Sequence, residues 1–282
     1  MTLVNLFFSA HQPERLKPQA ERPPVRSASA ESLAAALFDE ALNYEQFQNA
    51  AHKRYVPAIS VLLDLAKKYK LSPHPFRCAL SLSGTLLMQC EQFMPELIEL
   101  LRELSDTGCV EFIAETYYHS LSSLFSGCKS EFHKQVEIHS ATIDRLFEMK
   151  PILFRNTECL FSNSLAEEAL QMGFQGIITE GFDTLLEDSR SPDFVYSASN
   201  GLPVLLRNSK LSDELCASFA TKDWLGWPLT PDTFVECLAQ VDDMGVTIGM
   251  DFEAIGEDLW SDTGIADFLD ALIATMAQHF HI

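Results

Sequence analysis

Two carboxylates, Glu158 and Asp213, are the leading candidates for chemistry in this sequence. Glu158 ends the run Phe154–Glu158, which brings an arginine, an amide, a hydroxyl and a carboxylate into one short segment. A carboxylate in such a setting can attack an anomeric carbon and form a covalent glycosyl ester. We therefore take Glu158 as a candidate nucleophile. An ion pair with Arg155, or a cap on the following helix, explains the same spacing.

Asp213 is the candidate for the second carboxyl group. It lies shortly after the apolar segment Pro203–Leu206, where a loop can reach back over a shared pocket. Retaining glycosidases place two carboxyl groups about 5–5.5 Å apart, and the second one protonates the leaving oxygen. Asp213 would be this acid/base. Its position in Ser-Asp-Glu is also typical of a helix N-cap, so both interpretations stay open.

Other polar residues could bind a substrate near these carboxylates. His11, in His-Gln-Pro, follows the first apolar segment and could hydrogen-bond a sugar hydroxyl. Strand alternation puts Glu111 and Glu115 on one face, inside a barrel or at its mouth, with His119 shortly after them. Arg155 could contact substrate, or it could form a structural ion pair with Glu115.

Aromatic residues and histidines complete the set of candidates. Trp224 could stack on a sugar ring, although aromatic side chains in a barrel more often belong to the core. His133 and His139 are six residues apart on a predicted helix, so they do not share a face as a helical metal-binding pair would. There is no glycine-rich phosphate loop that leads from a strand into a helix. We therefore expect neither a metal nor a nucleotide cofactor.

Seven short apolar segments alternate with stretches of helical periodicity, and this pattern predicts an α/β fold. We expect a seven-stranded β/α barrel, an incomplete TIM-like barrel, in one domain that covers residues 1–282. The predicted strands are Leu3–Phe8, Phe76–Leu82, Val110–Ala114, Ile152–Phe154, Gly176–Thr179, Pro203–Leu206 and Val246–Met250.

The carboxyl ends of parallel strands open on one face of a barrel. Polar residues follow nearly every predicted strand, so they should converge there on one acidic pocket. They are His11, Ser83, Glu115, Glu158, Glu180, Asp213, Asp251 and Glu253.

Helices are predicted between these strands from the spacing of apolar residues. One begins at Ser164 with a capping box to Glu167, and another has Pro231 in its first turn. Pro18–Ser29 and Asp183–Asn200 are predicted to be irregular. The predicted helices are Ser32–Leu42, Pro57–Tyr69, Met94–Leu104, Lys129–Phe147, Ser164–Met172, Thr230–Met244 and Gly264–Phe280.

Charge and cysteine content limit the partners and the compartment. A net charge of −20 argues against nucleic acid and anionic membranes as partners, and an acidic surface also serves solubility. The seven cysteines contain no CxxC pair, which disfavours a disulfide framework and a zinc site. No secretory signal or membrane-spanning run is recognised. We expect a cytoplasmic protein, and oligomeric state is left open.

Several ordered motifs together resemble glycoside hydrolase family 57, in its α-amylase-like branch. The resemblance runs through nearly the whole chain. The motifs are His-Gln-Pro within Val4–Pro13, Ser-Leu-Ser-Gly-Thr within Phe76–Leu86, Glu-Phe-Ile-Ala-Glu-Thr-Tyr-Tyr-His-Ser-Leu within Val110–Leu121, Phe154–Glu158, Gly173–Gly181, Leu211–Asp213 and Asp251–Glu257.

This resemblance implies a seven-stranded barrel and a retaining mechanism without a nucleotide cofactor. It places the nucleophile on Glu158, the acid/base on Asp213, and substrate binding at His11 and around Glu111. Members of the family act on α-1,4-glucans such as starch, glycogen and maltodextrins, as amylases, glucanotransferases or branching enzymes. The expected partner is thus an α-glucan or maltooligosaccharide.

The sequence departs from the family pattern at two places. Family members continue into a helical domain, whereas this chain stops at Ile282, and the residues after Asp213 lack the family's aromatic-rich stretch. We therefore expect weak activity on long glucans. Three interpretations follow: a hydrolase or transferase, a glycan-binding barrel with little or no turnover, and, ranked last, a metal-dependent deacetylase.

Overall fold

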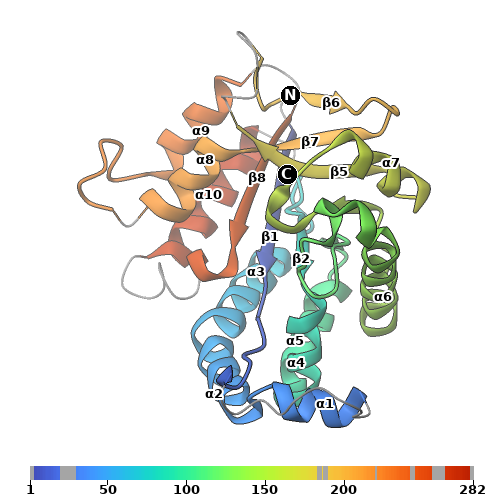
Figure 1. Ribbon diagram of the computed structural model, residues 1–282. Coiled ribbons are helices and arrows are strands. Elements are labelled where there is room, and N and C mark those ends of the chain that lie inside the picture. The colour runs from blue at the N-terminus through green and yellow to red at the C-terminus, as the bar shows by residue number, and fades with distance from the viewer. Residues whose placement is uncertain are drawn as a thin grey trace.

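The computed structural model describes residues 3–19, 30–182, 186, 190–219, 221–241, 245–255 and 264–279 (Figure 1). Parallel strands form a sheet that curls into a nearly closed barrel, and helices surround it, as the sequence predicts. The order of the strands is β3-β2-β1-β8-β7-β5-β4. Each predicted strand corresponds to one of these. Their bounds are β1 Leu3–Ala10, β2 Cys78–Leu82, β3 Val110–Phe112, β4 Leu153–Arg155, β5 Gly176–Gly181, β7 Pro203–Asn208 and β8 Gly245–Asp251.

One further strand, β6 (Val195–Ser197), pairs antiparallel with residues 203–205 at the start of β7. It lies inside Asp183–Asn200, which the sequence analysis predicted to be irregular. That prediction is wrong for these three residues. Such a short strand carries no two-residue periodicity long enough to recognise.

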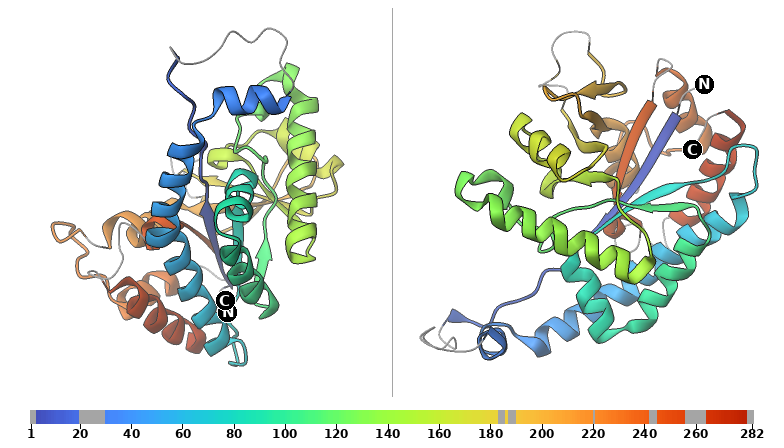
Figure 2. Two further views of the ribbon diagram at one scale, coloured as in Figure 1. Left: turned by 90° about the horizontal axis from the view of Figure 1, so that it is seen from below. Right: turned by 90° about the vertical axis from the view of Figure 1, so that its right-hand side faces the viewer.

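The barrel has two thin seams. At one, a single bridge between Ala114 and Phe154 joins the segment after β3 to β4, with Ala114 N 2.9 Å from Leu153 O. At the other, β7 and β8 share one register pair, Arg207 with Thr247. The strand pair β1 and β8, by contrast, is in register over most of its length, and the two strands lie side by side in Figure 2. The seams divide the barrel into a long arc, β8-β1-β2-β3, and a short arc, β7-β5-β4.

Ten α-helices are found in the described residues, and most follow the predicted positions. Lys129–Phe147 has the predicted bounds. Helices α4 and α8 were not predicted; in α4, Gly84 at its start and the mixed composition hide the periodicity. The predicted single helix Ser32–Leu42 is wrong, since the chain breaks there between α1 and α2. The helices are α1 Ala30–Leu37, α2 Glu40–Ala50, α3 Val56–Tyr69, α4 Gly84–Phe93, α5 Pro95–Asp106, α6 Lys129–Phe147, α7 Asn163–Gln171, α8 Ser209–Asp213, α9 Pro231–Ala239 and α10 Ile265–His279.

Two helix ends test the capping predictions. Helix α7 is capped by Ser162, whose hydroxyl accepts from Leu165 N at 3.1 Å, so the capping box at Ser164 is wrong. Ser162 has the extended backbone that turns a side-chain oxygen toward the first free amides. Thr230 caps α9, which begins at Pro231 as predicted.

Parts of the other predicted segments lie outside the described residues, namely 20–29, 183–185, 187–189, 242–244 and 280–282.

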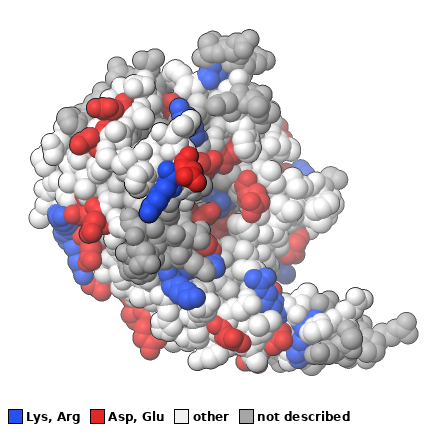
Figure 3. Space-filling model, turned by 90° about the vertical axis from the view of Figure 1, so that its left-hand side faces the viewer, with Lys and Arg blue, Asp and Glu red and all other residues white. Residues whose placement is uncertain are grey.

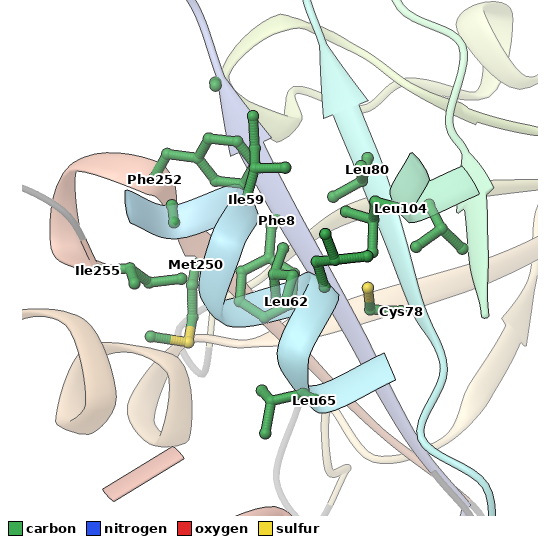
Figure 4. Packing of buried hydrophobic residues seen from close by; sticks show 14 of the residues in the cluster. Phe8, Ile59, Leu62, Leu65, Cys78, Leu80, Leu104, Met250, Phe252 and Ile255 are labelled. Carbon is green, nitrogen blue, oxygen red and sulfur yellow. The ribbon is translucent and has the colours of Figure 1, made fainter. Parts of the chain in front are cut away.

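Two hydrophobic clusters cover the outer faces of the two arcs. The larger cluster packs Phe8, Leu80 and Met250 of the long arc against helices such as α3, which contributes Ile59 and Leu62 (Figure 4). The smaller cluster packs the short arc against α6 and α7, with Phe132, Phe154, Leu165, Ile177 and Val204 among its members. Each arc therefore has a core of its own.

Surface charges are mixed where they can be seen. On the face in Figure 3, acidic side chains are spread over the surface with basic ones between them. Among the helices that the structure describes, none is both long and apolar enough to cross a bilayer.

Candidate active site

An apolar floor closes the inside of the barrel below its carboxyl-terminal mouth. Phe7, Ile113 and Ile178 form this floor, together with Cys159. Gly249 on β8 makes room for the ring of Phe7, since a Cβ atom there would overlap the ring. Side chains of one strand face alternate sides, so the inward positions above the floor are free to be polar.

Above the floor lies a cavity of about 300 Å³ at the carboxyl ends of the strands. Five of the polar residues predicted to converge line it, which confirms the pocket for them: His11, Glu115, Glu158, Asp251 and Glu253. Four of these five are carboxylates, so the cavity is acidic. The other lining residues are Ser9, Ala10, Ser81, His119 and Arg155.

Glu115 and Arg155 form a buried ion pair across the seam between β3 and β4. Arg155 Nη1 lies 3.5 Å from Glu115 Oε2, and their side chains are 10% and 1% exposed. The predicted pairing is confirmed. Burial alone would raise the pKa of Glu115, but the approach of His119 and the charge of Arg155 outweigh it, so this pKa lies below its ordinary value. The guanidinium carbon of Arg155 lies 5.8 Å from the centre of the Phe7 ring, directly on the floor.

His139 of α6 contacts the backbone of Glu115. Its Nε2 lies 2.8 Å from Leu82 O, and its Nδ1 lies 3.4 Å from the backbone N of Glu115. A neutral ring that donates from Nε2 and accepts at Nδ1 satisfies both contacts. Burial lowers the pKa of His139, which agrees with a neutral ring. His139 is therefore a buried structural histidine.

His119 connects Glu115 to Glu158. Its Nε2 lies 3.3 Å from Glu158 Oε1, and its Nδ1 lies 3.5 Å from Glu115 Oε2. Burial would lower the pKa of His119, but the two carboxylates outweigh burial and the charge of Arg155, so the pKa is raised above its ordinary value. The ring of His11 stacks on His119, with 4.4 Å between the ring centroids.

His11 is held from its other side by hydroxyl groups. Its Nδ1 lies 2.8 Å from Ser83 Oγ and 3.3 Å from Thr85 Oγ1. Burial, and then the charge of His119, lower the pKa of His11 to about 4. The stack thus pairs one ring whose pKa is lowered with another whose pKa is raised.

Three residues at this mouth have left-handed backbones although none is glycine. They are His119, Glu158 and Cys159, with φ of 52°, 56° and 51°. Such a conformation costs about 1–2 kcal/mol per residue. Glu158 is thereby turned out to the mouth, where its side chain is 71% exposed. Backbone strain of this kind is concentrated at functional sites.

The structural alternatives for Glu158 do not account for its contacts. Arg155 pairs with Glu115 instead, and helix α7 is capped by Ser162. In the described part of the chain, the hydrogen-bond partner of Glu158 is His119.

Asp213 is the last residue of α8 and is not its N-cap. Asn208 caps that helix by accepting from Leu211 N at 2.9 Å, so the N-cap interpretation of Asp213 is wrong. Arg207 holds Asp213, with Nη2 2.8 Å from its Oδ1. Arg207 Nη1 also lies 3.1 Å from Glu180 Oε1. The Asp213 side chain is 62% exposed and does not line the cavity itself.

Two predicted substrate-binding residues lie elsewhere. Glu111 lines a separate cavity of about 220 Å³ together with Leu3 and Arg77, at the amino-terminal end of the barrel. Of the two predicted positions, inside the barrel or at its mouth, Glu111 therefore takes the first. Four residues along a strand span about 13 Å, so it lies far below the acidic cavity that Glu115 lines. Trp224 is half-buried in a turn, where it packs over Gly226, and it is not among the residues that line the acidic cavity.

Several residues of the site were missed as site residues. Ser9 donates to Asp251 Oδ1, and Ser81 Oγ lies 3.3 Å from Glu115 Oε2. Both serines occupy inward strand positions, so two-residue periodicity could have found them. Arg207 also offered a signal, because a charged residue inside an otherwise apolar strand needs a partner.

No group of three or more His, Cys, Asp or Glu is placed to hold a metal in the ranges that the structure describes. His133 pairs instead with Glu168, with 2.6 Å between Nε2 and Oε2.

Comparisons with known proteins agree with this fold. A protein of Methanocaldococcus jannaschii named "Putative alpha-amylase" is 36% identical over 280 residues, which are 99% of this chain and 57% of that protein. A 4-α-glucanotransferase from Thermococcus litoralis has a similar fold, with a TM-score of 0.70 and 16% identity over all of this chain and 38% of that one. A branching enzyme from Pyrococcus horikoshii gives a TM-score of 0.69 and 13% identity over 98% of this chain and 67% of that one.

The chain thus spans little more than half the length of this curated relative. The sequence model of glycosyl hydrolase family 57 matches residues 5–282. With this match and the relative at 36% identity, the chain belongs to glycosyl hydrolase family 57.

Proposed function

We propose that this chain is a retaining glycoside hydrolase or glucanotransferase that acts on α-1,4-glucans. Glu158 is the nucleophile and Asp213 is the acid/base. One observation carries the proposal: a strained backbone turns Glu158 to the mouth of an acidic cavity, next to a histidine 3.3 Å away. The names of the related amylase, glucanotransferase and branching enzyme support the choice of an α-glucan.

The reaction would proceed in two steps. Glu158 attacks the anomeric carbon and forms a glycosyl ester, while Asp213 gives its proton to the leaving glycosidic oxygen. Asp213 then takes a proton from the incoming hydroxyl, which attacks the same carbon and releases Glu158. Water in this second step gives hydrolysis, and a sugar hydroxyl gives transfer.

The surrounding charges suit such a reaction. The transition state resembles an oxocarbenium ion, so the carboxylates of Glu115, Asp251 and Glu253 would stabilise its positive charge. Arg207 holds Asp213 through Oδ1. We propose that Oδ2 of Asp213 is the atom that meets the glycosidic oxygen. A separation of about 5–5.5 Å between the two carboxyl groups stays a prediction.

A glycan-binding barrel with little turnover is the second candidate. It is favoured by the exposure of Asp213, which pairs with Arg207 outside the cavity.

The assignment to a single domain and to the cytoplasm also stays a prediction. The seven cysteines are all unpaired, which supports a reducing compartment.

Product analysis after incubation with maltooligosaccharides tests the function. The unmodified protein should release shorter oligosaccharides, with longer ones as well if it transfers. Glu158→Gln and Asp213→Asn should each lose this activity, whereas Glu137→Gln, on the exposed face of α6, should keep it. Binding of glucan without any product, and with equal affinity for Glu158→Gln, would favour the binding protein instead.

Azide separates the two catalytic roles. With an aryl α-maltoside, Glu158→Ala should be rescued by azide as a β-glycosyl azide, because azide replaces the nucleophile in one displacement. Asp213→Ala should give the α-glycosyl azide, because azide then attacks the glycosyl ester. If Glu158→Ala gave the α-glycosyl azide and Asp213→Ala the β-glycosyl azide, Asp213 would be the nucleophile and Glu158 the acid/base.

A further inference from the structure

His119 stands between a buried carboxylate and an exposed one. Its side chain is 16% exposed, whereas Glu115 on one side is 1% and Glu158 on the other is 71% exposed. Each ring nitrogen faces one of these carboxylates, at 3.5 and 3.3 Å. The ring therefore joins the interior of the barrel to the proposed nucleophile.

This arrangement favours a charged ring. A neutral imidazole has one N–H and one lone pair, so one of its nitrogens would turn a lone pair toward a carboxylate. Only the imidazolium has an N–H on both nitrogens: Nε2 then donates to Glu158, and Nδ1 faces Glu115 at an ion-pair distance without a formed hydrogen bond. The raised pKa of His119, which the two carboxylates maintain against burial, agrees with this.

The other charged groups around His119 do not replace it. His11 stacks on the ring from the end of β1 and stays neutral above its low pKa of about 4. Arg155, on β4, points its guanidinium toward Glu115, and so disfavours a charge on His119. Asp251 and Glu253, from the end of β8, line the same cavity and add negative charge. His119 is thus the cationic group that interacts with both Glu115 and Glu158.

We propose that His119 is the positioning residue for Glu158. Its charged ring holds the Glu158 carboxylate at the mouth, and the buried Glu115 keeps the ring charged. The part played in catalysis rests on the proposed function above, whereas the coupling of the three groups does not.

The need for such a group follows from the local structure. Glu158 has a left-handed backbone and a largely exposed side chain, and His119 is its hydrogen-bond partner in the described part of the chain. Without the ring, the carboxylate is free to rotate away into solvent. Attack on an anomeric carbon requires the reacting atoms about 3–3.5 Å apart, and a misplacement of about 1 Å can cost 10²-fold in rate.

Titration by NMR tests the coupling without any activity. The pKa of the His119 ring should fall in Glu158→Gln and in Glu115→Gln, because each change removes a negative charge beside the ring. His133→Gln, at a histidine paired with Glu168 on another face, should leave it unchanged. If neither carboxylate variant moves the pKa of His119, the proposal is overturned.

Kinetics with an activated aryl α-maltoside tests the role of His119 in catalysis. A good leaving group needs little protonation, so loss of the proton from Asp213 should no longer limit the rate. The fall of kcat/KM at high pH should then reflect the deprotonation of His119. The rate should fall as the pH rises through the pKa of His119, and Glu115→Gln should move this fall to lower pH. His119→Gln keeps a donor, so it should lose this pH dependence but retain most of the rate.

The variant without any donor completes the test. His119→Ala should lose about 10²-fold in kcat/KM. If His119→Ala and His119→Gln both match the unmodified protein in rate and pH profile, the positioning role is refuted. If the unmodified protein cleaves nothing, the proposed function fails, and the titration still decides the coupling.

Discussion

Replacement of Arg155 by methionine should strongly destabilise the fold. Glu115 is 1% exposed and has Arg155 and His119 as its charged neighbours, both at 3.5 Å. One of its oxygens, Oε1, already lacks a hydrogen-bond partner in the described part of the chain. Loss of one partner from a buried pair costs about 3–5 kcal/mol, since a buried charge is left uncompensated. His119 remains, so we expect about 3 kcal/mol, at the lower end of this range.

Urea denaturation followed by circular dichroism measures this loss. Arg145→Met is the matched control, because Arg145 pairs with Glu91 at 2.7 Å on the surface, where the two side chains are 56% and 38% exposed. It should cost less than about 1 kcal/mol. The double variant with Glu115→Gln should recover most of the stability lost in Arg155→Met, because no buried charge is then left alone.

The pH dependence gives a second check on the same reasoning. In the unmodified protein the pKa of Glu115 is depressed, so its contribution to stability is present above the unfolded pKa and is lost as the pH falls through the folded one. Without the positive charge of Arg155, the pKa of Glu115 should be higher than in the unmodified protein. The difference in stability between the two proteins should therefore shrink in acid. A cost of Arg155→Met no larger than that of Arg145→Met, or a difference that grows in acid, would refute the role of this buried ion pair in stability.

Three further outcomes follow from the structure. Gly249→Ala should lower the free energy of unfolding by about 1–3 kcal/mol, because the new Cβ overlaps the ring of Phe7, and thermal unfolding of the variant measures this loss. His11 has a pKa of about 4 in the folded protein, below its ordinary 6.5, so its contribution to the free energy of unfolding should decline as the pH falls from about 6.5 to 4. In His11→Gln, the free energy of unfolding should therefore depend less on pH in that interval. Ser162→Ala should cost about 1 kcal/mol in urea denaturation as the loss of the N-cap of α7, and Ser164→Ala should cost less; equal losses would contradict the observed cap.

The barrel could be predicted from the sequence because its strands are short apolar runs that end in polar residues. The same pattern located the acidic pocket, and it linked Arg155 to Glu115 because a buried carboxylate needs a partner. Height along a strand was harder to infer. Alternation gives the face of a residue but not its level in the barrel, so it could not decide whether Glu111 lies inside the barrel or at its mouth.

Other features depend on contacts between distant segments. Arg207 on β7 gathers Glu180 and Asp213, and no local pattern reveals which carboxylates it meets. The contact of His119 with Glu158 likewise depends on two left-handed backbones that face each other from different loops. Nothing in the sequence marks these positions, since neither residue is glycine.

The two thin seams of the barrel have a geometric consequence for the mouth. Glu158 and Asp213 both follow strands of the short arc, so a change in the width of either seam leaves their separation as it is. His119 and Glu115 belong to the long arc and reach Glu158 and Arg155 across the single bridge at Ala114. A hinge at that bridge would part Glu158 from His119 without moving Glu158 and Asp213 apart. The proposed site is thus divided between the two arcs, with Glu158 and Asp213 on the short arc and His119 and Glu115 on the long one.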